Sequence, residues 1–222
     1  TIDLVDKLFA DAAAAVGATQ ASAPVATQTP AVPRVPVTST TVQAPDNTIT
    51  PANLEGYRQI SPDKIPGNIY KMLSENWMLI TAGNDAQYNM MTASWGGLGF
   101  LWNRPVAFVF IRPQRYTFDF VERNEGFTLS FFGEEYRKVL QLCGTKSGRE
   151  IDKVAETKLT PFATPSGNMA FEEASLVLDC RKCYTDMIEK GNFIDYETVA
   201  RWYPHEDFHK MYVAEIIGAW RR

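Results

Sequence analysis

The chain has 222 residues, of which 45% are hydrophobic and 12% aromatic, and its formal net charge at pH 7 is −4. This length supports one substantial hydrophobic core with appendages, and the negative charge argues against a broad basic surface for nucleic acid or lipid. No stretch approaches the roughly 18 consecutive apolar residues of a membrane span. We therefore expect a soluble protein with no nucleic-acid partner and no membrane span.

The first 50 residues differ in composition from the rest. Between residues 12 and 45 Arg34 alone is charged, and prolines recur among Ala, Val, Thr, Ser and Gln. Such a composition does not supply a packed core and is typical of an extended linker or arm. Residues 3–16 place Leu4, Val5 and Leu8 on one face of a short helix. Two interpretations stay open for this N-terminal arm, a disordered tail and a segment that embraces a neighbouring subunit.

The N-terminal sequence matches a secretory signal poorly. Asp3, Asp6 and Asp11 stand where a basic region and an uncharged apolar region are required. The cysteines are odd in number and too few for a disulfide scaffold, which indicates a reducing compartment. We expect a cytoplasmic protein. Because the chain starts at Thr1, an exported form with its leader removed is the alternative.

After residue 50 the sequence pattern is mostly β. The clearest strand is PVAFVFIRP, in which β-branched and aromatic residues lie between Pro105 and Pro113. EEYRKVLQLCG has helical apolar spacing and reaches Gly144, a typical helix end. The expected elements, in chain order, are a helical turn around 65–73, strands over 77–82, 89–100, 106–112 and 127–132, a helix over 134–144, and strands over 175–188 and 210–220.

Five or six strands at short spacing with a few short helices favour a mainly β fold, a β-barrel with short helices, over a doubly wound sheet. The chain contains no G-x-G-x-x-G or P-loop sequence to contradict this. Residues 192–209 carry too many turn and charged residues to be predicted as core. A barrel of this size can hold a ligand at its mouth or at a subunit interface.

Two short segments concentrate positive charge in this acidic chain. IRPQRYT places Arg112 and Arg115 directly after the clearest strand, and CGTKSGREIDK gathers cations, hydroxyl groups and glycine at a helix junction. Guanidinium and ammonium groups, hydroxyl donors and open backbone N–H groups are what a phosphate requires. For either segment alone, a solvated loop is the favoured interpretation. Beside the small hydroxyl residues of NMMTASWGGLGF, the two segments predict a dianion site.

The order of these motifs resembles the flavin reductase-like family, which has the FMN-binding split barrel fold. The motifs are N-M-M-T-A-S-W, R-P-x-R-Y-T, F-x-x-S-F-F, C-G-x-x-S-G-R-x-x-D-K, L-V-L-x-C-R and H-x-M-Y-V-A-E-I, from about residue 60 to 217. The flavoredoxin-like branch is the most similar. The resemblance implies a Greek-key split barrel for residues 51–222 that forms a homodimer and binds FMN near the subunit interface. The N-terminal arm, residues 1–50, lies outside it.

The resemblance also implies roles for individual residues. A flavin ring needs close backbone approach at its polar edge, small hydroxyl groups, and an apolar surface against its face. The residues that it places along the ring and ribityl chain are Asn89, Met90, Met91, Thr92, Ala93, Ser94 and Trp95. Those that it places at the FMN phosphate or its surroundings are Arg112, Arg115, Tyr116, Thr117, Ser147, Gly148 and Lys153, with Thr145 and Lys146 as weaker assignments.

The reaction expected from this resemblance is hydride transfer from NAD(P)H to flavin N5, followed by electron transfer to an acceptor. His209 is the one candidate for a direct catalytic role, and a structural hydrogen-bonding role is the alternative for it. We expect no metal site, because Cys180 and Cys183 are three apart in a strand and face opposite sides. Cys143 is either redox-sensitive beside the phosphate segment or a small buried hydrophobic residue.

Three functions are therefore open. The chain is an FMN-dependent NAD(P)H oxidoreductase, an electron-transfer flavoprotein with a redox protein partner and no nicotinamide site, or a split barrel that has lost its flavin. The two cationic segments argue against the last of these.

Overall fold

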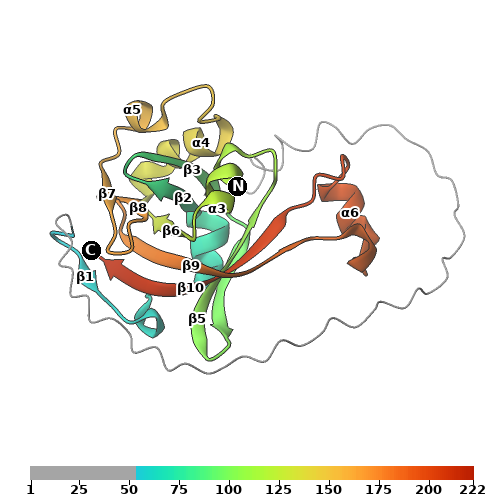
Figure 1. Cartoon of the computed structure of the whole chain (residues 1–222), viewed down its shortest axis with the longest axis horizontal. Coiled ribbons are helices and arrows are strands. Elements are labelled where there is room, and N and C mark those ends of the chain that lie inside the picture. Colours follow the sequence, from blue (N-terminus) through green and yellow to red (C-terminus); the bar gives the residue numbers. More distant parts are fainter. Residues whose placement is uncertain (1–53) are drawn as a thin grey trace, which may run out of the picture. The chain divides into compact units, whose positions relative to one another are not determined.

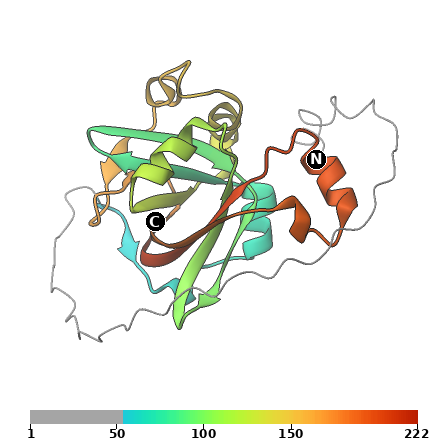
Figure 2. The ribbon, with the colours of Figure 1, turned by 45° about the vertical axis from the view of Figure 1, so that its right-hand side comes forward.

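The computed structural model describes residues 54–222, and the N-terminal arm, including the helix expected at 3–16, lies outside the described residues. Strands of one antiparallel sheet dominate the described region, with short helices packed around it (Figures 1 and 2). The strands are β1 (Arg58–Gln59), β2 (Met78–Asn84), β3 (Gln87–Ala93), β4 (Gly96–Leu101), β5 (Arg104–Ile111), β6 (Gly126–Phe131), β7 (Pro161–Ala163), β8 (Met169–Phe171), β9 (Leu176–Met187) and β10 (Lys210–Arg221).

The helices are short. They are η1 (Pro62–Lys64), α2 (Ile69–Lys71), η2 (Met72–Asn76), α3 (Tyr116–Arg123), η3 (Glu134–Tyr136), α4 (Arg137–Thr145), α5 (Lys153–Thr157), η4 (Lys190–Asn192) and α6 (Tyr196–Trp202). None of the helices in the described region is long and apolar enough to cross a membrane.

The main sheet has the order β3-β2-β6-β9-β10-β5-β4, with β1 paired to β10 and a separate β7–β8 hairpin. The mainly β fold with short helices is confirmed, but the sheet is not a closed barrel. Within residues 54–222, β3 and β4 form the two ends of the strand order and do not pair with each other. They are nevertheless consecutive along the chain, separated by Ser94 and Trp95.

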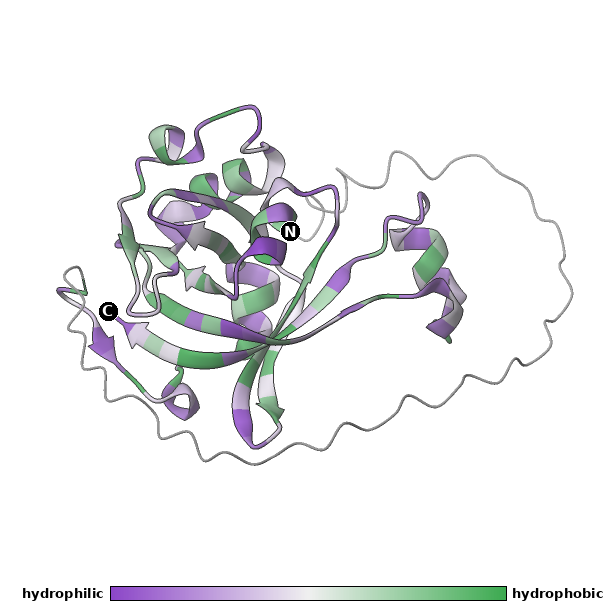
Figure 3. Cartoon of the chain, viewed as in Figure 1, coloured by the Kyte–Doolittle hydropathy of each residue, from purple (hydrophilic) through white to green (hydrophobic). Residues whose placement is uncertain are grey.

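Two apolar clusters hold the sheet and helices together, and much of the ribbon of the central strands has the green of hydrophobic residues in Figure 3. One cluster lies under α3 and joins Met91, Val109 and Phe120. The other lies under α4 and α5 and joins Met90, Leu140 and Cys143. Because successive strand residues face opposite sides, Met90 and Met91 of β3 belong to different clusters.

The expected boundaries needed three corrections. The strand expected over 77–82 begins at Met78 and continues through Gly83, which has a φ of 116° that suits glycine. The strand expected over 89–100 is two strands, broken at Ser94 and Trp95. The helix expected to end at Gly144 continues to Thr145, and Gly144 lets α4 pack closely on β3, since a Cβ there would lie 3.4 Å from Cβ of Thr92.

The sequence did not lead us to expect helices α3, α5 and α6. Helix α3 begins directly after Arg115 and buries Thr117, Phe120 and Val121, whose i, i+3, i+4 spacing is a helical signal. Helix α6 lies within the segment judged too polar for core. Asp195 caps it by accepting hydrogen bonds from the backbone N–H groups of Glu197 and Thr198.

Candidate functional site

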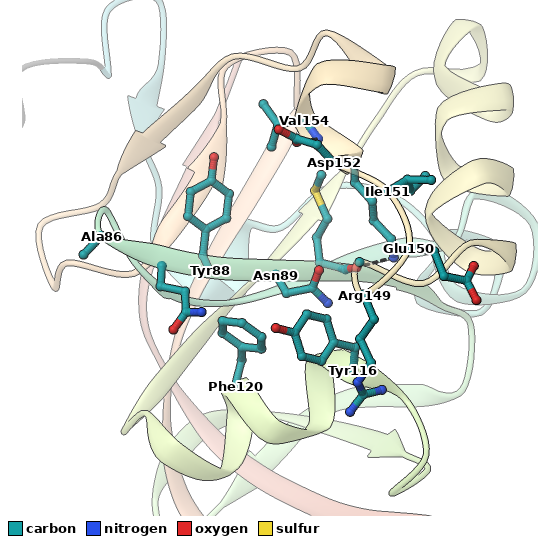
Figure 4. A pocket seen from close by; sticks show the side chains of 14 residues that line it. Ala86, Tyr88, Asn89, Tyr116, Phe120, Arg149, Glu150, Ile151, Asp152 and Val154 are labelled. Carbon is teal, nitrogen blue, oxygen red and sulfur yellow. Dashed lines mark hydrogen bonds between the residues drawn. The ribbon is translucent and has the colours of Figure 1, made fainter.

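A pocket of about 590 Å³ lies between the start of β3, helix α3 and the loop before α5 (Figure 4). Asn89 and Tyr116 lie beside each other in it, with Arg149 next to Tyr116. Five of the expected cofactor-binding residues line the pocket: Asn89, Met90, Tyr116, Gly148 and Lys153. The other lining residues are Ala86, Gln87, Tyr88, Phe120, Arg149, Glu150, Ile151, Asp152 and Val154.

Lys153 is the most unusual of these residues, because its side chain is almost completely buried. Its Nζ donates to the carbonyl oxygen of Met90 at 2.8 Å and to that of Cys143 at 2.9 Å. No carboxylate forms an ion pair with it among residues 54–222. Burial, together with the nearby positive charge of Arg115, lowers the pKa of Lys153 to about 8.

Arg115 extends this positive region. Its Nη2 donates to the carbonyl oxygen of Gly144 at 3.1 Å, and no carboxylate within the described region forms an ion pair with it. Burial, reinforced by the charge of Arg112, lowers its pKa from the ordinary value. Buried cations are normally paired with anions. Lys153 is buried and Arg115 partly buried, and neither has a carboxylate partner among residues 54–222, so the two cations are suited to an anion that comes from solution.

Gly148 lets its loop pack against Asn89 and Tyr116, two residues that line the pocket. A Cβ at position 148 would overlap Oδ1 of Asn89 and lie 3.2 Å from the ring of Tyr116. Asn89 in turn donates from Nδ2 to Oγ1 of Thr117 at 2.8 Å, and both side chains are buried. The loop approaches this closely only because residue 148 has no side chain.

The remaining residues of the second cationic segment lie differently. Thr145 and Lys146 are exposed and do not line the pocket, and the Thr145 hydroxyl donates to the Gln141 carbonyl within α4. Ser147 stabilises the loop turn, since its Oγ accepts from the backbone N–H of Arg149 and its carbonyl accepts from Glu150. Their side chains are not gathered around the pocket with Lys153.

The side chains of the expected ring-binding residues on β3 point to opposite faces of the sheet. Met91 packs in the core under α3, and the Thr92 hydroxyl donates to the Leu140 carbonyl at 2.6 Å. Ala93 and Ser94 are half-buried where the strand ends. This stretch therefore offers backbone groups and small side chains, as expected, but one of its two hydroxyl groups already bonds to α4.

Trp95 lies beyond this stretch and belongs to an aromatic group with Trp202 and His209. Its ring centroid is 5.2 Å from that of Trp202, in an edge-on arrangement, and 5.0 Å from that of His209. Nδ1 of His209 lies 2.9 Å from the hydroxyl of Tyr203. Burial and the charge of Arg112 lower the pKa of His209 to about 4, so its imidazole is neutral at pH 7.

Arg112 lies with this aromatic group and does not line the pocket. It forms an ion pair with Asp207 and donates from Nη2 to the Trp202 carbonyl at 2.8 Å. The expected cofactor residues therefore fall into two regions. The pocket is lined by Tyr116, Gly148 and Lys153 of the phosphate-type residues, and the end of β3 leads from it to Trp95, His209 and Arg112.

Several residues of the pocket were not assigned to the cofactor from the sequence, and Arg149 was counted only among the cations of the segment CGTKSGREIDK. Arg149 lies over the Tyr116 ring at 4.4 Å and forms a 2.7 Å ion pair with Asp119 of α3. Asp152 caps α5 by accepting from the N–H groups of Val154 and Ala155. An aspartate directly before a helical apolar pattern is a recognisable N-cap signal, but the Arg149 contact joins residues 30 apart and has no local signature.

The cysteines do not form a site. Cys180 is buried and Cys183 exposed, as expected for opposite strand faces. Burial raises the pKa of Cys143 to about 11, which favours the small hydrophobic role over the redox-sensitive one. Among the described residues, no group of three or more His, Cys, Asp or Glu is placed to hold a metal ion.

Comparison with known proteins connects this site to a family. A search of curated proteins found no match. The family model described as flavin reductase like domain matches residues 70–222. The chain belongs to this family. The match includes the pocket, the end of β3 and the group around Trp95.

Solved structures support the same fold for this flavin reductase-like chain. Flavoredoxin from Methanosarcina acetivorans is 22% identical, with a TM-score of 0.52 over 66% of this chain and 68% of that one. An FMN-binding domain of a flavin reductases-like enzyme from Shewanella baltica is 18% identical, with a TM-score of 0.53 over 74% and 76%. An NADH:FAD oxidoreductase from Streptomyces globisporus is 16% identical, with a TM-score of 0.50 over 66% and 75%.

Proposed function

We propose that this domain binds FMN and acts as an oxidoreductase of the flavin reductase type, in which NAD(P)H supplies hydride and an acceptor receives the electrons. The observation that carries this proposal is the pocket lined by the buried Lys153, which has no carboxylate partner within the described residues. The partly buried Arg115 adds its positive charge near Lys153 and also has no carboxylate partner there. A flavin phosphate is a dianion of the kind such cations bind. The reductase and oxidoreductase names of the structural relatives add support.

In this proposal Lys153, Arg115 and the Gly148 loop bind the phosphate. Asn89 and Tyr116 line the pocket itself. Backbone groups of residues 92–95, at the end of β3, orient the ring. Bound FMN supplies the hydride-accepting chemistry. Trp95 shields one end of the site from water. His209, which is neutral at pH 7, contributes a hydrogen-bonding group and not a positive charge.

The test is an absorbance spectrum of the purified protein, after reconstitution with FMN and removal of free flavin, before and after anaerobic NADH or NADPH. We expect a bound flavin spectrum that bleaches with one of the two nucleotides. A protein that retains no flavin at any FMN concentration tested contradicts the proposal. R115A combined with K153M should release the flavin, and K146A, which removes an exposed cation outside the pocket, is the matched control.

A second candidate is an electron-transfer flavoprotein without a nicotinamide site. One observation favours it, since Trp202 already packs edge-on against Trp95 and occupies surface that a second planar ligand would use. The similarity to a flavoredoxin agrees with this candidate. Flavin that bleaches with dithionite but with neither nicotinamide nucleotide would support it over the reductase.

We propose in addition that the domain forms a homodimer. The support is an apolar surface at the tip of the β4–β5 hairpin, where Phe100 is 71% and Trp102 52% exposed. Exposed aromatic residues close together commonly mark an interface. Sedimentation velocity of the whole chain tests this. We expect a dimer that F100S/W102S converts to a monomer, and a wild-type chain that sediments as a monomer contradicts the proposal.

A further inference from the structure

The long hairpin of β9 and β10 carries an insertion at its far end. The two strands pair as far as Met187 and Lys210, and the backbone N–H of Ile188 donates to the His209 carbonyl at 2.9 Å. The β9–β10 insertion, residues 188–209, contains η4 and α6. Figures 1 and 2 show α6 at the end of this hairpin, away from the helices that pack on the sheet.

The insertion has a small aromatic core of its own. Tyr203 stacks on Phe208 with centroids 4.7 Å apart, and Phe193 lies about 6 Å from both rings, at 5.9 and 6.0 Å. Tyr203 and His209 connect this core to Trp95. The aromatic core fixes the shape of the insertion, but it does not by itself fix where the insertion lies relative to the sheet.

Arg112, at the end of β5, makes the main polar connection between the insertion and the sheet. Its Nη1 pairs with Oδ2 of Asp207, and its Nη2 donates to the Trp202 carbonyl at 2.8 Å. Gln114 adds a third bond, from Nε2 to the same Asp207 oxygen at 2.7 Å. The guanidinium also lies 5.4 Å from the Tyr203 ring centroid. The Arg112 and Asp207 side chains are only 17% and 20% exposed, so solvent screens this pair weakly.

We propose that Arg112 is a positioning residue, which holds the β9–β10 insertion in place through Asp207 and thereby sets Trp202 and His209 against Trp95. The part of this inference that concerns FMN rests on the proposed function. The part that concerns the attachment of the insertion by Arg112 does not depend on it. It departs from the role that the family resemblance implies for Arg112, which is binding of the phosphate or its surroundings.

The contrast with Arg115 and Lys153 supports this division of roles. Arg112 already has a carboxylate partner, which a phosphate would have to displace at the cost of leaving the Asp207 carboxylate half-buried without its partner. Arg115 and Lys153 have no such partner within residues 54–222, and Lys153 lines the pocket. We therefore expect Arg115 and Lys153 to bind the phosphate, and Arg112 to hold the insertion in place.

The decisive experiment exchanges the two charges, in the variant R112D/D207R of the whole chain, and compares it with R112A, R112K and D207A. Three readouts are used: the FMN Kd, the rate of trypsin cleavage after Lys190 and Arg201 within the insertion, and the indole N–H resonances of Trp95 and Trp202, assigned with W95F and W202F. R112K keeps the charge but lacks the planar fork that bonds Asp207 and the Trp202 carbonyl together.

We expect R112A, R112K and D207A each to speed cleavage within the insertion at least about tenfold and to shift both indole resonances. The FMN Kd of R112A should change by less than about threefold, whereas R115A should raise it at least about tenfold. The exchanged variant restores the ion pair but not the bond to the Trp202 carbonyl, so its cleavage after Lys190 and Arg201 should be slower than that of R112A and D207A, with indole resonances closer to the wild-type positions. The matched control is K190E/E206K, which exchanges a pair that lies on the surface of the same insertion, at 2.6 Å. This control lacks the cleavage site after Lys190, and it should leave the FMN Kd, both indole resonances and the rate of cleavage after Arg201 unchanged.

Two results overturn the proposal. One is an R112A variant that loses FMN as severely as R115A while cleavage stays slow, which makes Arg112 a phosphate ligand. The other is an exchanged variant that cleaves as fast as the single variants although its circular dichroism shows a folded sheet. If the wild type binds no FMN, the proposed function fails, but cleavage and indole resonances still decide whether Arg112 positions the insertion.

Discussion

The ammonium group of Lys153 lies 2.8 Å from the carbonyl oxygen of Met90, which joins the first residue of α5 to the middle of β3. The same group reaches the Cys143 carbonyl of α4 at 2.9 Å. One buried cation therefore connects three elements at the edge of the pocket. Its two acceptors are neutral dipoles, so most of its positive charge is uncompensated by the chain around it.

The first prediction concerns the pH dependence of FMN affinity. The pKa of Lys153 is about 8 in the free protein, and a bound dianion favours its protonated form. Below pH 8 the FMN Kd should be nearly constant, and above it the Kd should rise by up to about tenfold per pH unit. Fluorescence titrations between pH 6.5 and 9.5 measure this. K153M is the control, and it should bind more weakly with no such rise.

The second prediction concerns Gly148. A methyl group at this position overlaps Oδ1 of Asn89, so G148A must displace the loop or break the Asn89–Thr117 hydrogen bond. We expect the FMN Kd to rise at least about tenfold, equivalent to about 1.4 kcal/mol or more. The control is G191A, since a Cβ at Gly191 meets no atom within 4 Å. Equal affinities for the two variants would show that the Gly148 loop does not contact the flavin.

The third prediction concerns stability in acid. The pKa of His209 is about 4 in the folded chain and about 6.5 when unfolded. Between these values the unfolded chain binds more protons, so the free energy of unfolding falls as pH falls from 6.5 to 4. The loss due to His209 is up to about 3 kcal/mol.

H209Q removes this titration but keeps an acceptor for the Tyr203 hydroxyl. Urea unfolding of both proteins from pH 4 to 7 should give a flatter curve for the variant. Parallel curves would mean that His209 is not buried as a neutral side chain.

The fourth prediction concerns Asp179, whose buried carboxylate holds the β7–β8 turn on β9. It accepts hydrogen bonds from Thr164 and Ser166 at Oδ2 and from Asn168 at Oδ1, each at 2.7 Å. D179N keeps the size but places an amide N–H₂ against hydrogen-bond donors. We expect a loss of about 2–4 kcal/mol in the free energy of unfolding. D186N, an exposed position on the same strand, should cost less than about 0.5 kcal/mol.

Local patterns predicted the strands of the sheet well and its helices less well. Residues 106–111 are β-branched or aromatic apart from Ala107, and they form most of β5, because such a run has few alternatives to a buried strand. Helix α6 was missed because its polar residues face water and only Val199 of the helix is buried. Its stability depends on an Asp195 cap and on contacts that lie outside any local window.

The contacts of the candidate site were even harder to predict from local patterns than the helices were. The family resemblance grouped Arg112 with Arg115 because both belong to the motif R-P-x-R-Y-T. In the structure their guanidinium groups have different partners, since Arg112 donates to the Trp202 carbonyl and Arg115 to the Gly144 carbonyl. Arg112 meets Asp207 95 residues later. Lys153 was expected at the site, but its burial against Met90 and Cys143 follows from the packing of α4 and α5 on β3, which no spacing rule encodes.

The break between β3 and β4 has a consequence for cofactor loading. Neither the β2–β3 ladder, which ends at Ala93, nor the β4–β5 ladder, which begins at Gly96, includes Ser94 or Trp95. A molecule that binds the backbone there need not compete with strand pairing. Exchange of a ligand between β3 and β4 should therefore be limited by diffusion and binding, with no slow phase from partial unfolding of the sheet. The folded apoprotein should remain able to bind the cofactor at any time after synthesis.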